Sequence, residues 1–500
     1  MNSVRERDSV FALPEPLTRF KSPQPANSNI GKRSASKGLF IGLEAVDRLS
    51  VRICAAEEKN ISPGLPKTRF ASIILTQAFI INPMVSPLST TEDGASVPVK
   101  IPRWATALDQ AASRLQRRMV EIRRHLHQHP EPSGEETETT AYLAEIVNET
   151  GLPIRIGPEG RGLIVDSDLK TDVSRVAFRG DIDALWIQDA KEAEYRSRRA
   201  GVMHACGHDA HAAGVTGTIF LLHELAQAGL LPNDVHWRAI LQPSEETASG
   251  AREMISIGAL EEVSGIFALH LDPTRPAGAI GVRSGAFTAS CDEFEIHIKG
   301  RGGHGARPHE TIDPIAASAQ MILGLYQMFP RRMDPHQPVV ATVGQVSSGH
   351  SPNVIPETAA MKGTLRALDE RTRARAKEVM ADIVAGIAKT TGCEIHLTFP
   401  FGCPGVVNDV ACTETIRLAA RMIPDGLRVD EMSHASMGGE DFAEYLQHVR
   451  GAMFRLGCQP ASGCSTLHSP EFDIDEKALG IGARLMARAV ILRAESKSAE

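Results

Sequence analysis

The segment Met203–His211, MHACGHDAH, gathers one thiol, three imidazoles and one carboxylate in a short stretch of chain. Cys206 and His208 stand two positions apart in a glycine-containing turn, so both side chains can face one point. A thiolate and an imidazole favour a borderline metal ion such as Zn²⁺ and are compatible with Mn²⁺. A structural alternative stays open, because a single cysteine is commonly a small buried apolar residue and a histidine after glycine can donate within a turn.

More side chains of the metal-binding type follow apolar segments elsewhere in the chain. Four segments read as strands that lead into polar residues: AFRGDIDAL (177–185), RAILQPSEE (238–246), GIFALHLDP (265–273) and MFRLGCQPASGCSTLHSP (453–470). The polar residues at their ends are Arg179, Asp181, Asp183, Glu245, Glu246, His270 and His468. In open α/β sheets ligands bind outside the carboxyl ends of the strands, so these four ends together predict one shared site.

The adjacent carboxylates Glu245 and Glu246 suggest two separate roles, one as a metal ligand and one in proton transfer. If one of them binds a metal ion, the other can take a proton from a metal-activated water and relay it to a leaving group. The alternative is a solvated helix N-terminus, in which Ser244 or Glu245 caps a helix that starts at Ala248.

Strands alternate with helices from Trp104 onward, which predicts an α/β fold with a central mixed sheet flanked by helices. The expected strands are 175–178, 235–241, 265–269 and 452–456, and the expected helices are 105–128, 210–228, 248–257 and 441–447. His127 and His129 lie near the end of the first helix and are interpreted as partners of its C-terminal dipole.

Residues 288–402 have their own order of expected strands and helices, which predicts an inserted α+β domain. Its expected elements are four strands (293–299, 339–346, 359–367, 394–399) and two helices (314–328, 370–389). This domain would interrupt a catalytic domain made of 102–287 and 403–500. We interpret 1–101, rich in Ser, Pro, Arg and Asn in its first two thirds, as a mostly disordered or irregular segment.

Composition excludes several classes of protein. The 500 residues carry 54 Lys+Arg and 61 Asp+Glu, a net charge of −7, which supplies no bulk cationic field for nucleic acid. No CxxC, GxSxG or GxxxxGK[ST] occurs, so a zinc ribbon, a serine nucleophile elbow and a P-loop lack support. Gly300, Gly302 and Gly305 spell GxGxxG, but the following strand lacks the acidic residue that would bind a ribose.

The compartment is inferred from what the first hundred residues contain. Phe70–Val85 is apolar but shorter than the roughly 20 residues of a membrane span. We therefore expect a cytoplasmic protein without membrane or nucleic-acid partners, with secretion kept open if translation starts near residue 66.

Ten ordered motifs over about 104–495 together resemble the M20 metallopeptidase superfamily, in particular its amidohydrolase branch of hippurate, N-acyl-amino-acid and auxin-conjugate hydrolases. They are RRHLHQHPE (123–131), FRGDIDAL (178–185), MHACGHDAH (203–211), QPSEE (242–246), ALHLDP (268–273), GRGGHGARPH (300–309) with DPI (313–315), NVIPE (353–357), GTLRAL (363–368), GGEDF (438–442) and LHSPEFDIDEKAL (467–479).

The resemblance implies a site with two divalent ions per subunit, Mn²⁺ or Zn²⁺, with Co²⁺ and Ni²⁺ as further candidates. The implied metal ligands are Cys206, His208, Glu246, His270 and His468. Glu245 corresponds to the general base and acid, and Asp183 to the carboxylate that orients a ligating imidazole. His211 is left outside the ligand set, either behind the ligands or on the helix surface. The GGEDF loop resembles a pocket wall without assigned chemistry.

The inserted domain is implied to be a lid and dimerisation domain. There His304 corresponds to the histidine that steadies the oxyanion, often in the partner subunit's centre, and Asn353 and Arg366 to residues that hold the substrate. Structural alternatives are a turn role for His304 and a pair between Arg366 and Asp369.

The function implied is hydrolysis of small N-acyl amino acids by a homodimer. Alternatives are a dipeptidase or carboxypeptidase, a deacetylase of N-acetylated diamino acids, and a relative that binds without cleaving.

Overall fold

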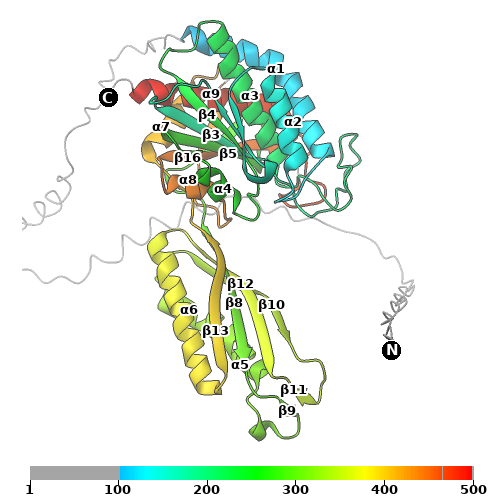
Figure 1. Ribbon diagram of the computed structural model, residues 1–500. Coiled ribbons are helices and arrows are strands. Elements are labelled where there is room, and N and C mark those ends of the chain that lie inside the picture. Colours follow the sequence, from blue (N-terminus) through cyan, green and yellow to red (C-terminus); the bar gives the residue numbers. More distant parts are fainter. Residues whose placement is uncertain (1–101, 425, 464, 498–500) are drawn as a thin grey trace, which may run out of the picture. The chain divides into compact units, whose positions relative to one another are not determined.

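The computed structural model describes residues 102–424, 426–463 and 465–497 (Figure 1). The predictions for residues 1–101 lie outside the described residues. The described residues belong to one compact unit. Its larger sheet has the strand order β1-β2-β4-β3-β5-β16-β6-β15. The strands are β1 (Ile154–Ile156), β2 (Leu163–Asp166), β3 (Arg175–Asp181), β4 (His236–Gln242), β5 (Val263–Pro276), β6 (Ala279–Val282), β15 (Arg428–Glu431) and β16 (Gly451–Gln459).

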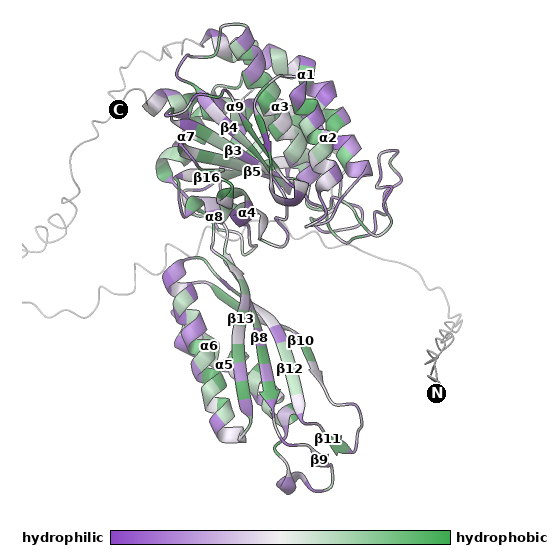
Figure 2. Ribbon diagram, in the orientation of Figure 1, coloured by the Kyte–Doolittle hydropathy of each residue, from purple (hydrophilic) through white to green (hydrophobic). Residues whose placement is uncertain are grey.

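Both faces of this sheet are covered by helices (Figure 1). One apolar cluster joins a sheet face to α1 (Arg103–Gln128), α2 (Thr137–Asn148), α3 (His208–Gln227), α7 (Val410–Arg421) and α9 (Lys477–Lys497). A second cluster joins the other face to α4 (Gly250–Ser256) and α8 (Phe442–Leu446). α1 carries a stripe of buried apolar residues that packs against α3 and α9, and most of its arginines face solvent (Figure 2). Arg123 is the exception, because it is fully buried.

The parallel pairs lie in the centre of the sheet. β3 runs parallel to β4 and to β5, and β5 runs parallel to β16, whereas β2 pairs antiparallel with β4. The prediction of a central mixed sheet flanked by helices is therefore confirmed. The carboxyl ends of β3, β4, β5 and β16 meet at one edge, which is the condition for a shared site.

A separate four-stranded sheet has the order β10-β12-β8-β13 and is antiparallel throughout. Its strands are β8 (Ser290–Lys299), β10 (Val339–Ser348), β12 (Thr358–Ala367) and β13 (Glu394–Cys403), and α5 (Pro314–Arg332) and α6 (Glu370–Thr391) share an apolar cluster with it. Asp313 and Asp369 cap these helices by accepting backbone N–H groups. The role of this region as a lid and the domain boundaries at 288 and 402 stay predictions.

Short strand pairs complete the fold. β7 (Gly285–Ala286) pairs with β14 (Val407–Asn408), and β9 (Gly303–His304) pairs with β11 (Val354–Ile355). Among the residues that the structure describes, no helix has the length and apolar character needed to cross a membrane.

The predicted end of the strand at 265–269 is wrong. The sequence suggests a strand that stops at Leu269, just before His270. The observed β5 continues to Pro276, because β16 pairs with it as far as Gln459. His270 therefore projects from within a strand, where the ladder hydrogen bonds fix its backbone.

Candidate metal centre

The segment that carries Cys206 and His208 turns sharply into α3. Gly207 lies between them with φ = 94°, the left-handed region that glycine adopts without strain. A Cβ atom at this position would lie 2.7 Å from Cδ1 of Leu271, so a larger residue would also have to displace that side chain. The turn directs the Cys206 thiol and the first imidazole of α3 toward the carboxyl ends of the strands.

His468 reaches the same place from the other end of the chain. Its backbone N–H donates to the carbonyl of Ala205 at 2.8 Å, and its φ is 62°, a strained value for a non-glycine residue. Strain of this kind persists only where surrounding contacts enforce it, and it is concentrated at functional sites. The hydrogen bond from His468 to Ala205 thus holds the loop after β16 beside the Cys206 turn.

The five residues predicted as metal ligands are brought together, although they span positions 206 to 468. Cys206 Sγ lies 3.5 Å from His270 Nε2, and His468 Nε2 lies 3.4 Å from Glu246 Oε1. Two trios have all their ligand atoms within 4.8 Å of one another: Cys206, His208 and His270, and Cys206, Glu246 and His468. Cys206 belongs to both, so its sulfur lies between two potential ion positions.

The chemistry of these donors fits divalent metal ions. Nε2 of His208 and Oε1 of Glu246 are buried and have no hydrogen-bond partner. Buried polar atoms are normally satisfied, so atoms left open in this way require a partner that is not a protein group. One sulfur, three imidazole nitrogens and one carboxylate form a donor set typical of Zn²⁺ and related ions.

Asp183 lies behind His208, where the sequence predicts it. Nδ1 of His208 is 3.0 Å from both the carboxylate and the backbone oxygen of Asp183, which leaves Nε2 bare. The other Asp183 oxygen accepts from Ser133 Oγ at 2.7 Å and from the Glu246 N–H at 3.0 Å. Burial opposes ionisation of Asp183, but the hydrogen bonds from His208, Ser133 and the Glu246 N–H, together with the charge interaction with His208, outweigh it and lower the pKa of Asp183. This arrangement can orient a ligating imidazole.

Glu245 is nearly buried beside the cluster. Its Oε2 lies 3.9 Å from His208 Nε2, and its carboxylate groups with those of Glu440 and Asp441 within 4.8 Å. Burial and the like charges of Glu440 and Glu246 raise the pKa of Glu245 well above its usual range. A carboxyl group with a raised pKa suits proton transfer in both directions.

The alternative in which this pair caps a helix is wrong. α4 starts at Gly250, and its N-cap residue Ser249 makes no side-chain capping bond. The Ser244 hydroxyl is occupied elsewhere, since it bonds Glu136 at 3.2 Å and accepts from Arg161 at 3.1 Å. Neither Ser244 nor Glu245 caps the helix.

A fully buried guanidinium neutralises the carboxylates behind the cluster. Arg179 Nη1 donates to Asp181 at 2.6 Å, and its Nη2 lies 2.7 Å from Asp441 and 3.2 Å from Glu440. Its Nε donates to Gln242 at 2.8 Å. The GGEDF loop is therefore linked to β3 through the charge of Arg179 and to β4 through hydrogen bonds from Gln242 to Asp441. The resemblance of this loop to a pocket wall did not predict these links.

Two histidines differ from their sequence interpretation. His211 is buried, so the helix-surface alternative is wrong, and its Nδ1 lies 2.6 Å from Asp181. His127 is also buried, with its two nitrogens 2.7 Å from Asp209 and 3.2 Å from Asp189. Its ring therefore contacts two carboxylates, in a buried network that includes the Arg123–Asp209 ion pair and that the dipole interpretation does not include.

The predicted residues of the smaller sheet lie at its two opposite ends. His304 pairs with Val354 in the β9–β11 ribbon, its Nδ1 accepts from the Ala306 N–H at 3.1 Å, and the carbonyl of Asn353 accepts from Gly305 at 2.8 Å. In the described part of the chain no hydrogen bond or ion pair joins His304 or Asn353 to the metal-ligand cluster.

Arg366 lies at the other end of the sheet, near the crossovers of the chain. Its Nη1 donates to the carbonyl of Met437 at 3.0 Å, just before the GGEDF loop. The alternative in which it pairs with Asp369 is wrong, because that carboxylate caps α6 through Thr372.

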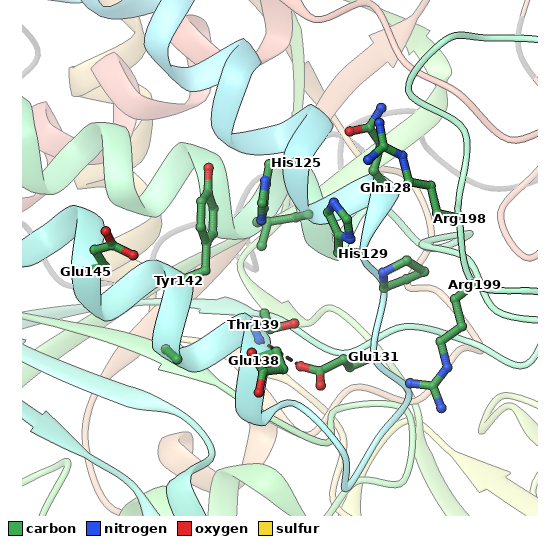
Figure 3. Close-up of a pocket in the computed structure, with 13 residues that line it drawn as sticks. His125, Gln128, His129, Glu131, Glu138, Thr139, Tyr142, Glu145, Arg198 and Arg199 are labelled. Carbon is green, nitrogen blue, oxygen red and sulfur yellow. Dashed lines mark hydrogen bonds between the residues drawn. The ribbon is translucent and has the colours of Figure 1, made fainter.

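A cavity of about 560 Å³ opens between α1, α2 and the loop at Arg198–Arg199 (Figure 3). His125 stacks on Tyr142 there with ring centroids 3.7 Å apart. Its lining contains none of the predicted ligands, nor Glu245. The candidate chemistry is therefore assigned to the cluster at the strand ends and not to this cavity.

Comparisons with known proteins agree with the cluster. The family model described as peptidase family M20/M25/M40 matches residues 177–492. An N-acetylcysteine deacetylase of Bacillus subtilis is 37% identical over 76% of this chain and 97% of its own, and thermostable carboxypeptidase 1 of Saccharolobus solfataricus is 35% identical over 73% and 92%. A B. subtilis structure described as a dinuclear metal-binding peptidase of the M20 family superposes with a TM-score of 0.66, at 35% identity, over 77% of this chain and 99% of that one.

Proposed function

Because the chain belongs to peptidase family M20/M25/M40, whose members are hydrolases of amide or peptide bonds, we propose that it cleaves the amide bond of small N-acyl amino acids. The observation that supports this most is the convergence of five proposed ligands, Cys206, His208, Glu246, His270 and His468. Glu245 lies beside them and groups with His208 and Glu246, but it joins no trio with Cys206. Such a site combines metal ligands with a separate acid–base group.

The proposed ligands hold two divalent ions, which when bound would polarise the substrate carbonyl and lower the pKa of a water molecule. Glu245 accepts a proton from the attacking water as the water oxygen bonds to the carbonyl carbon. Glu245 then donates that proton to the amide nitrogen as the C–N bond breaks, so a carboxylic acid and an amine leave. Arg366 holds the free carboxylate of the substrate. Asn353 lies with His304 at the opposite end of the small sheet, so its contact with the substrate would come from a second subunit.

A substrate panel tests this proposal. Hippurate, N-acetyl amino acids including N-acetylcysteine, and dipeptides are offered to the full chain with added Mn²⁺ or Zn²⁺. We expect the N-acyl amino acids to be cleaved fastest. Faster cleavage of dipeptides would favour the peptidase alternative, which the similarity to a carboxypeptidase also supports. No cleavage of any member with either metal would favour a binding protein.

Replacing Cys206 with serine tests the metal centre. A serine hydroxyl is a far poorer anionic ligand than a thiol, and Cys206 belongs to both trios, so we expect metal affinity to fall at least about 10-fold. Elemental analysis after dialysis measures the effect. Cys412→Ser is the matched control, because this buried cysteine lies on α7 outside both trios. Unchanged metal in Cys206→Ser would mean that the thiol is merely packed.

The oxyanion role proposed for His304 requires a second subunit to supply it. β8 separates the crossover at Ser290 from the His304 end of the sheet, and its ten residues span about 30 Å. Five apolar side chains of the same small domain are exposed on α5 and on the edge strand β10: Leu323, Tyr326, Met328, Val340 and Val346. We call these five residues the α5–β10 surface, and propose that it forms the interface of a homodimer.

We expect Leu323→Glu to shift the protein from dimer to monomer and to lower activity with it, because a charge would enter the proposed interface. Sedimentation velocity measures the mass, and a hydrolysis assay runs in parallel. Val410→Glu is the control, since Val410 is an exposed apolar residue of α7. A monomeric wild-type protein with full activity would contradict this proposal.

A further inference from the structure

His211 is a third imidazole near the cluster, and both of its nitrogens are engaged. The residue is fully buried on α3. Its Nδ1 lies 2.6 Å from Asp181 Oδ1, and its Nε2 lies 2.9 Å from the backbone nitrogen of Leu271. The ring thus bridges the end of β3 and the part of β5 that follows His270.

These two partners determine which nitrogen carries hydrogen. A backbone N–H can only donate, so Nε2 of His211 must accept from Leu271 and cannot itself carry a hydrogen. Nδ1 therefore carries it and donates to Asp181. Neither nitrogen is left for a metal ion, although Asp181, His208 and His211 bring their ligand atoms within 4.8 Å of one another.

Leu271 passes this constraint to His270. The carbonyl oxygen of Leu271 lies 2.8 Å from Nδ1 of His270, which must donate to it. Nε2 of His270 then carries no hydrogen, and it lies 3.5 Å from Cys206 Sγ. The rings of His211 and His270 are also in contact, with centroids 4.9 Å apart. Leu271 is therefore held at its N–H by His211 and at its carbonyl by His270.

We propose that His211 is a positioning residue that holds Leu271, and through Leu271 sets the orientation and tautomer of His270 for metal binding. This inference rests on the proposed function, because it assumes that the cluster binds metal. Without the Nε2 acceptor, the buried N–H of Leu271 has no partner and the backbone beside His270 is released. Loss of such an outer hydrogen-bond partner typically weakens metal affinity by about 10- to 100-fold.

Two substitutions separate the two hydrogen bonds of His211. The amide oxygen of glutamine can accept near the position of Nε2, so His211→Gln can keep the bond from Leu271. The amide NH₂ of asparagine can donate near the position of Nδ1, so His211→Asn keeps only the bond to Asp181. The two variants remove the same ring from the same place and differ by one methylene, so a general loss of packing would affect both.

The test is the Zn²⁺ dissociation constant of the full chain, measured by competition with a chromophoric chelator. We expect a 10- to 100-fold increase for His211→Asn and recovery of most of this loss in His211→Gln. His223→Asn, on the same helix, should match the wild type. Equal weakening by the two His211 variants, or no weakening by His211→Asn, would overturn the inference. A wild-type chain that binds no Zn²⁺ would overturn the proposed function itself, and this result is distinct from the other two.

Discussion

Replacing Glu245 with glutamine is expected to lower kcat by about 10²- to 10⁴-fold and to leave the metal content unchanged. Glutamine has nearly the same shape, but its amide cannot accept and return a proton. Glu245 groups with His208 and Glu246 and, separately, with Glu440 and Asp441, but it shares no trio with Cys206. The loss should therefore appear in turnover, measured with an N-acetyl amino acid, while elemental analysis shows wild-type metal.

The adjacent carboxylate supplies the control for this prediction. Oε1 of Glu246 is buried without a hydrogen-bond partner and lies 3.4 Å from His468. Glu246→Gln should therefore lose metal as well as activity, because it removes a proposed ligand. If metal-loaded Glu245→Gln retained turnover near the wild-type value, Glu245 would not be the acid–base group. If Glu246→Gln kept its metal, the division of labour between the two carboxylates would be wrong.

The elements that the sequence predicts well are those whose pattern is strong locally. α1 shows a clear helical stripe of apolar residues and ends at Gln128 as expected. β3 is fully buried and β4 is largely buried, each around a short apolar run, 176–178 in β3 and 239–241 in β4. The sequence predicts both strands to within a few residues of their ends. Patterns of this kind report burial directly, because the spacing of apolar residues follows the period of each element.

Other elements escape because their signal is weak or non-local. β1, β6 and β15 have only three or four residues each, too few to show alternation. α9 is apolar on nearly every side because it packs between α1, α3 and α7, so it lacks a clear stripe. The extension of β5 beyond His270 depends on pairing with β16, about 180 residues later.

The residues of the candidate site also divide into those that the local sequence predicts and those that it does not. Each proposed ligand could be singled out because it follows an apolar strand or lies in a dense polar segment, and the structure brings all five together. The groups behind them could not be assigned. Arg179 is separated from Asp441 by 262 positions, and the acceptor role of His211 depends on a backbone N–H of β5. Such partners follow only from the packed fold.

The buried charge of Arg179 leads to the second large effect. Arg179→Met should destabilise the protein by about 3–5 kcal/mol, because methionine fills similar space but leaves Asp181, Glu440 and Asp441 buried without their cation. Burial already raises the pKa of Asp441 to about 7 even with the guanidinium present. The free energy of unfolding, measured in urea for the full chain, should show the loss. Arg114→Met should change it by less than about 1 kcal/mol, because the Arg114–Glu224 pair is largely exposed.

A double substitution tests whether uncompensated charge causes the loss. Asp441→Asn removes one of the buried negative charges that Arg179 neutralises, so it should cost less in the Arg179→Met background than in the wild type. The double variant would then be more stable than the sum of the two single losses implies. Strict additivity would mean that Arg179 acts through packing alone, and the carboxylates near Glu245 would then not depend on its charge. A clear coupling would mean that this one guanidinium permits an acidic group to be buried beside the metal ligands, where the proposed proton transfer needs it.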